Sequence, residues 1–430
     1  MFRAEVNYFS LMVSPKDAKG QFVSNLTRDD FQVLEDGVEQ KVLDFETTNG
    51  GRHYGDVAIR MVDVPSSEGL ILPKPPPPAD VASRLFIIFI DDLHMTASLT
   101  PQLKTVLKQI RNTLIHDNDL VGFVSSGYSS IQIDPSYDYG HKRFDEVIDK
   151  VMGSGPSIQD IINMQQGADG LNELNHNVNV AFSAADDLLE QMAQITSLRK
   201  AFIWISSGYS LDPFKDARLR VEQERYASMG GCDQDPNADP NNSSSNNNTS
   251  GMCPQQGGGD GTINQVAAAN QSYGMDPFGN PSMEFKESDL IRQVAELIRA
   301  ANRANVIFYP LDPRGLIAGL NDASMNMQLT YAEQRDWIQQ TTDTLKVLAE
   351  QTGGIAAVNM NDYTKFIRTI DNMMSDYYTI GYQSSNPDPL HLVRRIEIKV
   401  KKPGIKLTPG ADYQDVYTLK RPSAKAKVKK

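Results

Sequence analysis

The sequence contains few cysteines and none of the glycine-rich motifs that bind phosphates or dinucleotides. It has two cysteines in 430 residues, Cys232 and Cys253, too few for a disulfide scaffold and without the partners of a zinc site. Both lie in a segment rich in Gly, Asn, Ser and Pro, where a single loop-closing disulfide and a pair of free thiols fit the pattern equally well. The sequence also lacks a phosphate-cradling glycine loop and a dinucleotide-binding fingerprint.

Basic residues are outnumbered by acidic ones, 42 to 54, and the end of the chain is the exception. The formal net charge is −12 and the isoelectric point is about 5.1, which argues against nucleic acid as the main partner. Residues 419–430 are strongly basic, and we expect them to form a solvated tail; an arm that binds nucleic acid or a membrane surface is the alternative.

Long apolar runs are absent. The longest, LFIIFI, suits a buried strand and is far shorter than the run of about 18 residues that a transmembrane helix needs. The first residues, MFRAEVNYFSLMV, lack the basic start, apolar stretch and cleavage site of a signal peptide. We therefore expect no transmembrane segment, and a chain that is either intracellular or exported with its signal already removed.

The chain divides into several segments of different composition. Residues 1–50 read as a small β-unit with a hairpin signal at Asp36-Gly37. Residues 51–83 form a linker that contains the run PKPPPP, which predicts a semi-rigid polyproline spacer. Residues 384–418 return to β-pattern, and we expect these strands to join the N-terminal unit in a sandwich-like arrangement.

Between these flanks, residues 84–383 alternate short buried strands with amphipathic helices. This pattern predicts an α/β fold with a doubly wound, mostly parallel sheet that is covered on both faces. Any ligand site should lie beyond the carboxyl ends of the strands. Residues 229–284, which include PNNSSSNNNTS, cannot bury enough apolar surface to order themselves and are predicted to be a disordered insertion.

The motif SSGYS occurs twice, at 125–129 and 206–210, and each copy follows a predicted strand. The first strand of the α/β segment ends in FIDDLHMT, which offers Asp91, Asp92, His94 and Thr96 as candidate metal ligands. Carboxylate and hydroxyl oxygens suit Mg²⁺, whereas an imidazole shifts the preference toward transition metals. Helix capping and hydration account equally well for Asp92 and Thr96.

A further strand ends in YPLDPRGL at the same predicted edge. Asp312 and Arg314 could contact a ligand there, or they could form an ion pair that stabilises a proline-constrained turn.

The order RLFIIFIDD, DLVGFVSSGYS, RKAFIWISSGYS, ANRANVIFYPLDPRG, LAEQTGG and YYTIGYQ resembles a von Willebrand factor A domain. More narrowly, the chain is similar to the bacterial VWFA-related Acidobacterial family, including β-segments such as VLEDGVEQKVLDF and RRIEIKVKKPGIKL. The resemblance implies an exported protein, secreted or periplasmic, that binds a protein or envelope component. It also implies a metal-ion-dependent adhesion site, which leaves one position of the metal open for a partner's carboxylate.

The adhesion-site residues carry over only in part. Asp91 matches the first aspartate, but Leu93 and Met95 stand where two hydroxyls belong. A register shifted by one begins at Asp92, with His94 and Thr96 in the hydroxyl positions; Ser154 and Ser157 are candidates for the middle threonine. Ser207 stands in the fourth-strand loop where the family has an aspartate. The resemblance therefore implies a degenerate site that binds Mg²⁺, Ca²⁺ or Mn²⁺ weakly.

These observations favour a non-enzymatic protein-binding or adhesion module, with Ser126, Ser207, Asp312 and Arg314 as candidate ligand contacts. A serine hydrolase that uses Ser207, His94 and Asp91 is the alternative from another class, although neither SSGYS copy fits the Gly-x-Ser-x-Gly pattern. A purely structural module of an envelope assembly is a third reading. The sequence does not identify the partner or the oligomeric state.

Overall fold

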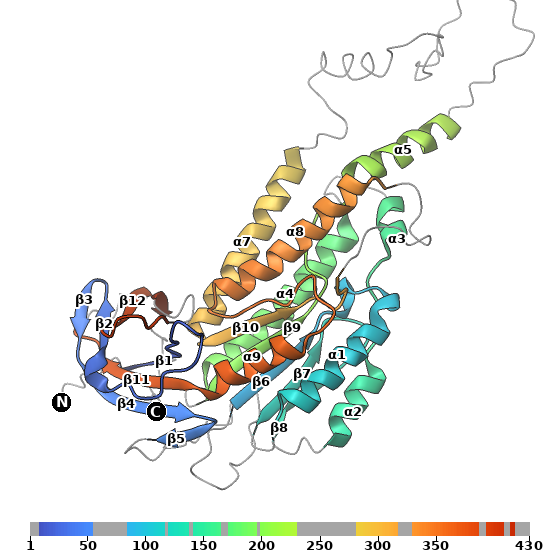
Figure 1. The fold of residues 1–430 in the computed structure, drawn as a ribbon. Coiled ribbons are helices and arrows are strands. Elements are labelled where there is room, and N and C mark those ends of the chain that lie inside the picture. Colours follow the sequence, from blue (N-terminus) through green and yellow to red (C-terminus); the bar gives the residue numbers. More distant parts are fainter. Residues whose placement is uncertain are drawn as a thin grey trace, which may run out of the picture.

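In the computed structural model the chain forms a mixed α/β fold, with one five-stranded sheet and two four-stranded antiparallel sheets beside it (Figure 1). The structure describes residues 8–54, 84–116, 119–136, 141–164, 171–195, 198–229, 281–316, 329–386, 393–407 and 413–417. Cys232, Cys253, the PKPPPP run and residues 419–430 lie outside these ranges.

The five-stranded sheet occupies the middle of the chain and has the strand order β10-β9-β6-β7-β8. The first four of these are parallel to one another, and β8 is antiparallel to β7. Its strands are β6 (Arg84–Ile90), β7 (Leu120–Ser125), β8 (Gln132–Ser136), β9 (Arg199–Ile205) and β10 (Val306–Leu311).

Helices connect these strands and cover both faces of the sheet. They are α1 (Thr100–Thr113), α2 (His141–Lys150), α3 (Ile158–Asn163), α4 (Asn172–Ala193), α5 (Lys215–Met229), α7 (Pro281–Arg303), α8 (Tyr331–Glu350) and α9 (Thr364–Ser375), with the 3₁₀ turns η2 (Asp92–His94) and η3 (Ala97–Leu99) after β6. The alternation of buried strands and amphipathic helices that the sequence predicts is therefore present in the described residues.

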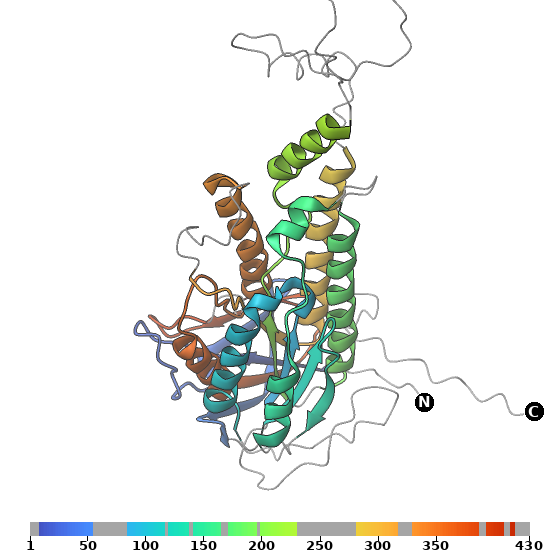
Figure 2. The same ribbon diagram turned by 90° about the vertical axis from the view of Figure 1, so that its right-hand side faces the viewer.

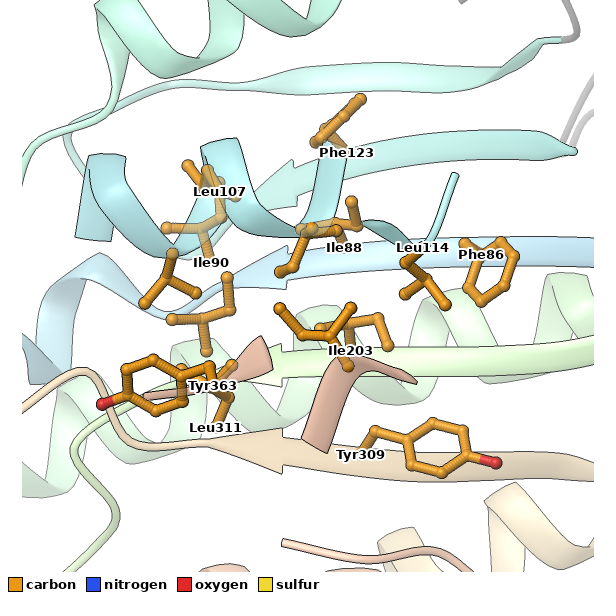
Figure 3. Packing of buried hydrophobic residues seen from close by; sticks show 14 of the residues in the cluster. Phe86, Ile88, Ile90, Leu107, Leu114, Phe123, Ile203, Tyr309, Leu311 and Tyr363 are labelled. Atoms are coloured by element: carbon orange, nitrogen blue, oxygen red, sulfur yellow. The ribbon is translucent and has the colours of Figure 1, made fainter. Parts of the chain in front are cut away.

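The central strands are buried on both faces because their side chains alternate between two cores. On β6, Phe86, Ile88 and Ile90 pack against α1, α2 and α9 (Figure 3). The intervening Leu85 and Phe89 pack with side chains of α4 and α7 on the opposite face. Figure 2 shows α1 and α2 on one side of the sheet and α4 and α7 on the other.

The two antiparallel sheets are built from strands of both chain ends. Their orders are β1-β11-β4-β5 and β13-β12-β2-β3. The strands are β1 (Tyr8–Val13), β2 (Phe31–Glu35), β3 (Val38–Gln40), β4 (Val42–Asn49), β5 (Arg52–Tyr54), β11 (Tyr377–Gln383), β12 (Val393–Val400) and β13 (Tyr413–Tyr417), and η1 (Arg28–Asp30) precedes β2. Their inward side chains form one shared hydrophobic core, and the sheets lie at the end of the central sheet where the parallel strands begin (Figure 1).

Three segment limits differ from the sequence-based prediction. The range 84–383 ends with β11, but β11 pairs with β1 and β4 in a flanking sheet and not with the central strands. The predicted linker 51–83 begins with β5, which pairs with β4. The predicted insertion 229–284 extends too far, because α7 begins at Pro281. The central unit is therefore shorter than predicted at its end, whereas β5 and the start of α7 extend regular structure into segments predicted as linker and insertion.

The hairpin predicted at Asp36-Gly37 is confirmed. β2 and β3 pair antiparallel on either side of it. Asp36 and Gly37 have φ angles of 49° and 82°, as a type I′ turn requires.

No helix in the described part of the chain combines the length and the apolar character needed to traverse a lipid bilayer.

Lys200 at the start of β9 is a buried base that gives the protein a pH-dependent stability. Its Nζ donates to the carbonyls of Met192 and Ile195 at 3.0 and 2.6 Å, where α4 ends. Burial lowers the pKa of Lys200 from 10.5 to about 7. Between these values the unfolded chain binds a proton that the folded chain does not. The free energy of unfolding should therefore rise with pH, by up to about 1.4 kcal/mol per pH unit.

Urea denaturation at pH 7 and pH 9 measures this effect, with Lys200→Met as the matched control. The wild-type protein should gain more stability than the variant over this interval. Equal pH responses in both proteins would show that Lys200 keeps an ordinary pKa.

Candidate functional site

The loops that follow the parallel strands converge at the carboxyl edge of the central sheet. The strand ladder continues past the strand ends, because Asp91 N–H donates to the carbonyl of Ile205 and Ser126 N–H donates to that of Ile90. Residues that are far apart in the sequence are thereby placed around Asp91. This edge is where the sequence predicts a ligand site.

Asp91 is the centre of a hydrogen-bond network and is fully buried. Its Oδ1 accepts from Nδ1 of His94 at 2.9 Å and from the hydroxyl of Ser126 at 2.8 Å. Its Oδ2 accepts from the hydroxyls of Ser206 and Tyr209 at 2.8 and 2.6 Å. Burial by itself raises the pKa of Asp91, but the interaction with His94 and these hydrogen bonds hold it below its ordinary value. The network therefore keeps an ionised carboxylate inside the protein.

The two SSGYS copies contribute to this network in different registers. Ser125 and Ile205 lie level with Ile90 of β6, so the first copy begins one residue earlier relative to the sheet than the second. The second serine of the first copy, Ser126, is therefore level with the first serine of the second copy, Ser206. Both hydroxyls donate to Asp91 from opposite sides. The opening serine of the second copy, not Ser207, is the functional counterpart of Ser126.

Tyr209 is a second residue of the network that the sequence reading missed. Its ring packs against His94 and Phe182 with centroid distances of 4.6 and 4.8 Å, and its hydroxyl accepts from Nε1 of Trp204 at 2.9 Å. Burial and the charge of Asp91 raise the pKa of Tyr209 well above its ordinary value. Tyr209 therefore remains a neutral donor to Asp91. The tyrosine of the first copy, Tyr128, is instead 77% exposed.

Asp92 is buried beside Asp91 and holds the first SSGYS loop in place. Its Oδ2 accepts from the backbone N–H of Ser129 at 2.7 Å, and its Oδ1 accepts from Ser126 at 3.1 Å. The Asp92 carbonyl accepts from the backbone N–H of Ser154 at 2.9 Å. Both carboxylates after β6 thus act as acceptors for the neighbouring loops.

The donor set does not fit a divalent cation as it stands. Each oxygen of Asp91 already accepts two hydrogen bonds, and Met95 is buried in the hydrophobic core. In the shifted register, the hydroxyl of Thr96 pairs with that of Ser98 at 2.8 Å rather than facing the carboxylates. A cation would have to displace at least one hydroxyl donor from Asp91.

The other candidate ligands are also engaged elsewhere or lie apart from Asp91. The Ser157 hydroxyl caps α3, and the Ser154 hydroxyl donates to the carbonyl of Asp92 at 3.1 Å. The Ser207 hydroxyl is buried and has no hydrogen-bond partner. Within the described residues, no group of three or more His, Cys, Asp or Glu side chains is arranged to hold a metal ion. Asp91, Asp92 and His94 are brought together; Thr96 and Ser207 do not join them.

The hydrolase alternative requires a base in contact with a nucleophile. Nε2 of His94 and Oγ of Ser207 are both buried without a hydrogen-bond partner, so they do not pair with each other. The hydroxyl of Ser126 donates to the aspartates and not to an imidazole. The geometry therefore contains no base–nucleophile pair among these residues.

Asp312 and Arg314 form an ion pair after β10. Nε of Arg314 donates to both oxygens of Asp312, at 2.9 and 3.0 Å, and Nη2 donates to Oδ2 at 2.7 Å. Nη2 also donates to the hydroxyl of Thr341 on α8 at 2.9 Å, and the guanidinium lies over the ring of Trp337. The pair holds the turn after β10 against α8.

A pocket of about 310 Å³ lies beside this turn, at the carboxyl edge between α1 and the loops after β10 and before α9. Its residues are mostly neutral: Pro101, Gln102, Thr105, Val106, Gln109, Pro313, Arg314, Gly315, Asn361 and Tyr363. Tyr363 donates its hydroxyl to the carbonyl of Asp312 at 2.7 Å, and its ring lies next to Leu311 at the end of β10 (Figure 3). Oε1 of Gln109 and Nη1 of Arg314 are buried without a partner.

Large apolar side chains are exposed in or beside the loops that follow β7 and β10, and one more at the start of α8. Tyr128, Leu316 and Met152 are 77%, 56% and 48% exposed, and Tyr331 at the start of α8 is 68% exposed. Leu316 adjoins the pocket, since its N–H donates to Oδ1 of Asn361 at 2.7 Å. We call Tyr128, Met152, Leu316 and the pocket the carboxyl-edge rim; Tyr331, at the end of α8 that contacts α5, is not part of it. The rim is the solvent-accessible part of the carboxyl edge, whereas Asp91, the charged residue at the centre of that edge, is buried.

Gly208 allows the second SSGYS loop to approach α8. It has a φ of +80°, and an added Cβ would lie 2.0 Å from the carbonyl oxygen of Thr341. Gly208→Ala should therefore lower the free energy of unfolding by about 3 kcal/mol, from backbone strain and the clash together. Gly404→Ala is the control, because Gly404 has a φ of +79° and no neighbour within 4 Å. It should lose only about 1 kcal/mol.

Chemical denaturation of both variants checks this difference. Equal losses would mean that the close approach of Gly208 to α8 contributes nothing to stability.

The fold and the edge define a mixed α/β protein with a buried, hydrogen-bonded carboxylate and an accessible, largely uncharged rim. Comparison with known proteins adds no assignment: no family model matches the chain, and no curated protein matches it.

Proposed function

We propose that this chain is a protein-binding module of the von Willebrand factor A type, without enzymatic activity, that docks a partner on the carboxyl-edge rim. The observation that carries the proposal is the pocket of about 310 Å³ with the exposed side chain of Leu316 beside it, on an edge that also exposes Tyr128 and Met152. Exposed apolar patches next to a concave surface are typical of protein–protein contact sites. Parallel strand order, helices on both faces and the position of Asp91 after β6 support the family assignment.

The proposed adhesion site is degenerate and works without a metal. The hydroxyls of Ser126, Ser206 and Tyr209 stand where a cation would otherwise balance Asp91. The buried network then serves to fix the loops in position, and the rim makes the contacts. By the same resemblance we place the protein outside the cytoplasm, as a secreted or periplasmic module that binds a protein or an envelope component.

The chemistry of the rim favours a neutral peptide segment with an apolar side chain. Arg314 is already paired with Asp312, so the pocket offers no unbalanced charge. Gln109 offers a buried acceptor and Arg314 a buried donor without partners, which match the N–H and C=O of a peptide group. Two prolines and Tyr363 supply apolar surface in the same pocket.

Selection from a display library of random twelve-residue peptides tests this proposal. Enriched peptides should bind the wild-type protein and lose at least about tenfold in affinity, near 1.4 kcal/mol, with Leu316→Ser or the pocket-filling Thr105→Trp. Val38→Ser is the matched control, since Val38 is 57% exposed on β3 in a flanking sheet. Failure to enrich any peptide, or equal loss with the control variant, would count against the rim as the docking site.

A further inference from the structure

The amino end of the central sheet contains two neighbouring buried arginines with opposite surroundings. Arg84 on β6 and Arg199 on β9 face each other in register where these strands begin. Both are nearly inaccessible, with exposures of 3% and 5%. The guanidinium of Arg199 lies over the ring of Tyr377 on β11, 4.6 Å from its centroid. The pair thus lies at the junction between the central sheet and a flanking sheet.

Arg84 has two carboxylate partners. Its Nε and Nη2 donate to the two oxygens of Asp119 at 2.8 and 2.6 Å, and its Nη1 donates to Asp371 at 2.6 Å. A fourth bond joins Nη2 to the carbonyl of Leu114 at 2.9 Å. Charge and hydrogen-bonding capacity are therefore satisfied for this arginine.

Arg199 has no such partners among the described residues. Its Nε and Nη1 are buried and make no hydrogen bond. Burial lowers its pKa, and the groups that act against this effect are the phenols of Tyr309 and Tyr377, not carboxylates. A buried, unpaired guanidinium costs several kcal/mol. The contrast with Arg84 shows what Arg199 lacks, which is an oxyanion.

Two further polar side chains interact with the charge of Arg199. The hydroxyl of Tyr309 is buried without a partner, and in Figure 3 it points toward the amino ends of the strands. Its pKa is raised to about 12 by burial, against the influence of Arg199 and Arg84, so it remains a donor at neutral pH. Lys16, which precedes β2, is half-buried, and its pKa is lowered by burial and by the charge of Arg199.

We infer that this junction binds a small oxyanion of the phosphate class, held by Arg199 and Tyr309, with the ammonium of Lys16 as a nearby positive charge. A tetrahedral anion offers several acceptors at once, which suits a guanidinium, a phenol and an ammonium that approach from different elements. The anion bridges β9 and β10 at the point where Arg199 packs on Tyr377 of the flanking strand β11. Its binding therefore stabilises the junction between the two parts.

Thermal denaturation at constant ionic strength tests the site, with inorganic phosphate replacing chloride. The melting temperature of the wild-type protein should rise with phosphate concentration, and sulfate should act in the same way. Arg199→Met should abolish the rise and keep at least wild-type stability without phosphate, because it removes an unpaired charge. Tyr309→Phe should weaken phosphate binding severalfold. Arg335→Met, at an exposed arginine on α8, should respond as the wild type does.

Two results would overturn the site. One is a wild-type melting temperature that does not respond to phosphate or sulfate beyond its response to chloride. The other is a phosphate response that persists unchanged in both Arg199→Met and Tyr309→Phe. Acetate distinguishes a planar carboxylate from a tetrahedral oxyanion. A rise in melting temperature with acetate equal to that with phosphate would contradict a site built for a tetrahedral anion.

Discussion

Replacement of Asp91 by alanine should lower the free energy of unfolding by about 3–5 kcal/mol. The substitution removes the carboxylate that accepts from the buried hydroxyls of Ser206 and Tyr209, while Ser126 keeps Asp92 as an acceptor. Buried donors without partners destabilise more than the loss of a single hydrogen bond. Denaturation by urea at pH 7 measures the change.

Asp187→Ala provides the matched control, because Asp187 is exposed on α4. It should change stability by no more than about 0.5 kcal/mol. An Asp91→Ala variant as stable as this control would show that the network around Asp91 does not hold the carboxyl edge together.

The second large effect is expected at the opposite end of the molecule, where Glu35 and Arg394 form a buried ion pair. Their side chains are 1% and 0% exposed, and Nη1 of Arg394 donates to Glu35. The hydroxyl of Ser384 donates to Glu35 at 2.7 Å and lies 2.7 Å from Nη1 of Arg394. Glu35→Leu alone should lower the free energy of unfolding by about 3–5 kcal/mol, because it removes the carboxylate that pairs with a buried guanidinium.

The double variant Glu35→Leu, Arg394→Met should recover most of this loss, since an apolar pair replaces a buried ion pair with little net change. Additive losses in the two single variants and the double variant would contradict the pairing. The experiment also tests whether β2 and β12, which stand more than three hundred residues apart in the sequence, fold as one unit.

The sequence predicts the layered fold because its apolar residues follow two clear patterns. Runs such as LFIIFI are buried on both faces, and their alternating residues enter two separate cores. The limits of the segments were harder to predict. β11 has the apolar pattern of a central strand, but its partners are β1 and β4, and no local feature of the sequence specifies that pairing.

Within the candidate site, the sequence identifies the loops that converge on Asp91 but not the contact made by Ser206. The resemblance points to Ser207 of the second SSGYS copy, because a metal-site aspartate is expected there. The serine that contacts Asp91 is Ser206. Side chains alternate along a strand, so an offset of one residue at its end reverses which of two adjacent serines faces a neighbour. The repeat itself is the signal that points to Ser206 and Tyr209, but the register is visible only once the strands are paired.

The two ends of the central sheet are thus assigned different roles. The carboxyl edge has a buried anion, Asp91, whose donors all come from the protein itself. The amino end has a buried cation, Arg199, whose acceptors are absent from the described residues. A buried charge is costly unless it is paired. Because Asp91 already has its donors, we expect no metal cation at the carboxyl edge. Because Arg199 lacks acceptors, we expect an oxyanion at the amino end.

Calorimetric titration of Mg²⁺, Mn²⁺ and Ca²⁺ into the intact protein and an Asp91→Asn variant tests the central claim most directly. Since four donors from the protein itself saturate Asp91, none of the three ions should give a heat beyond that of dilution, in either protein. A saturable heat with any ion in the wild type, lost in Asp91→Asn, would contradict a docking edge that works without metal.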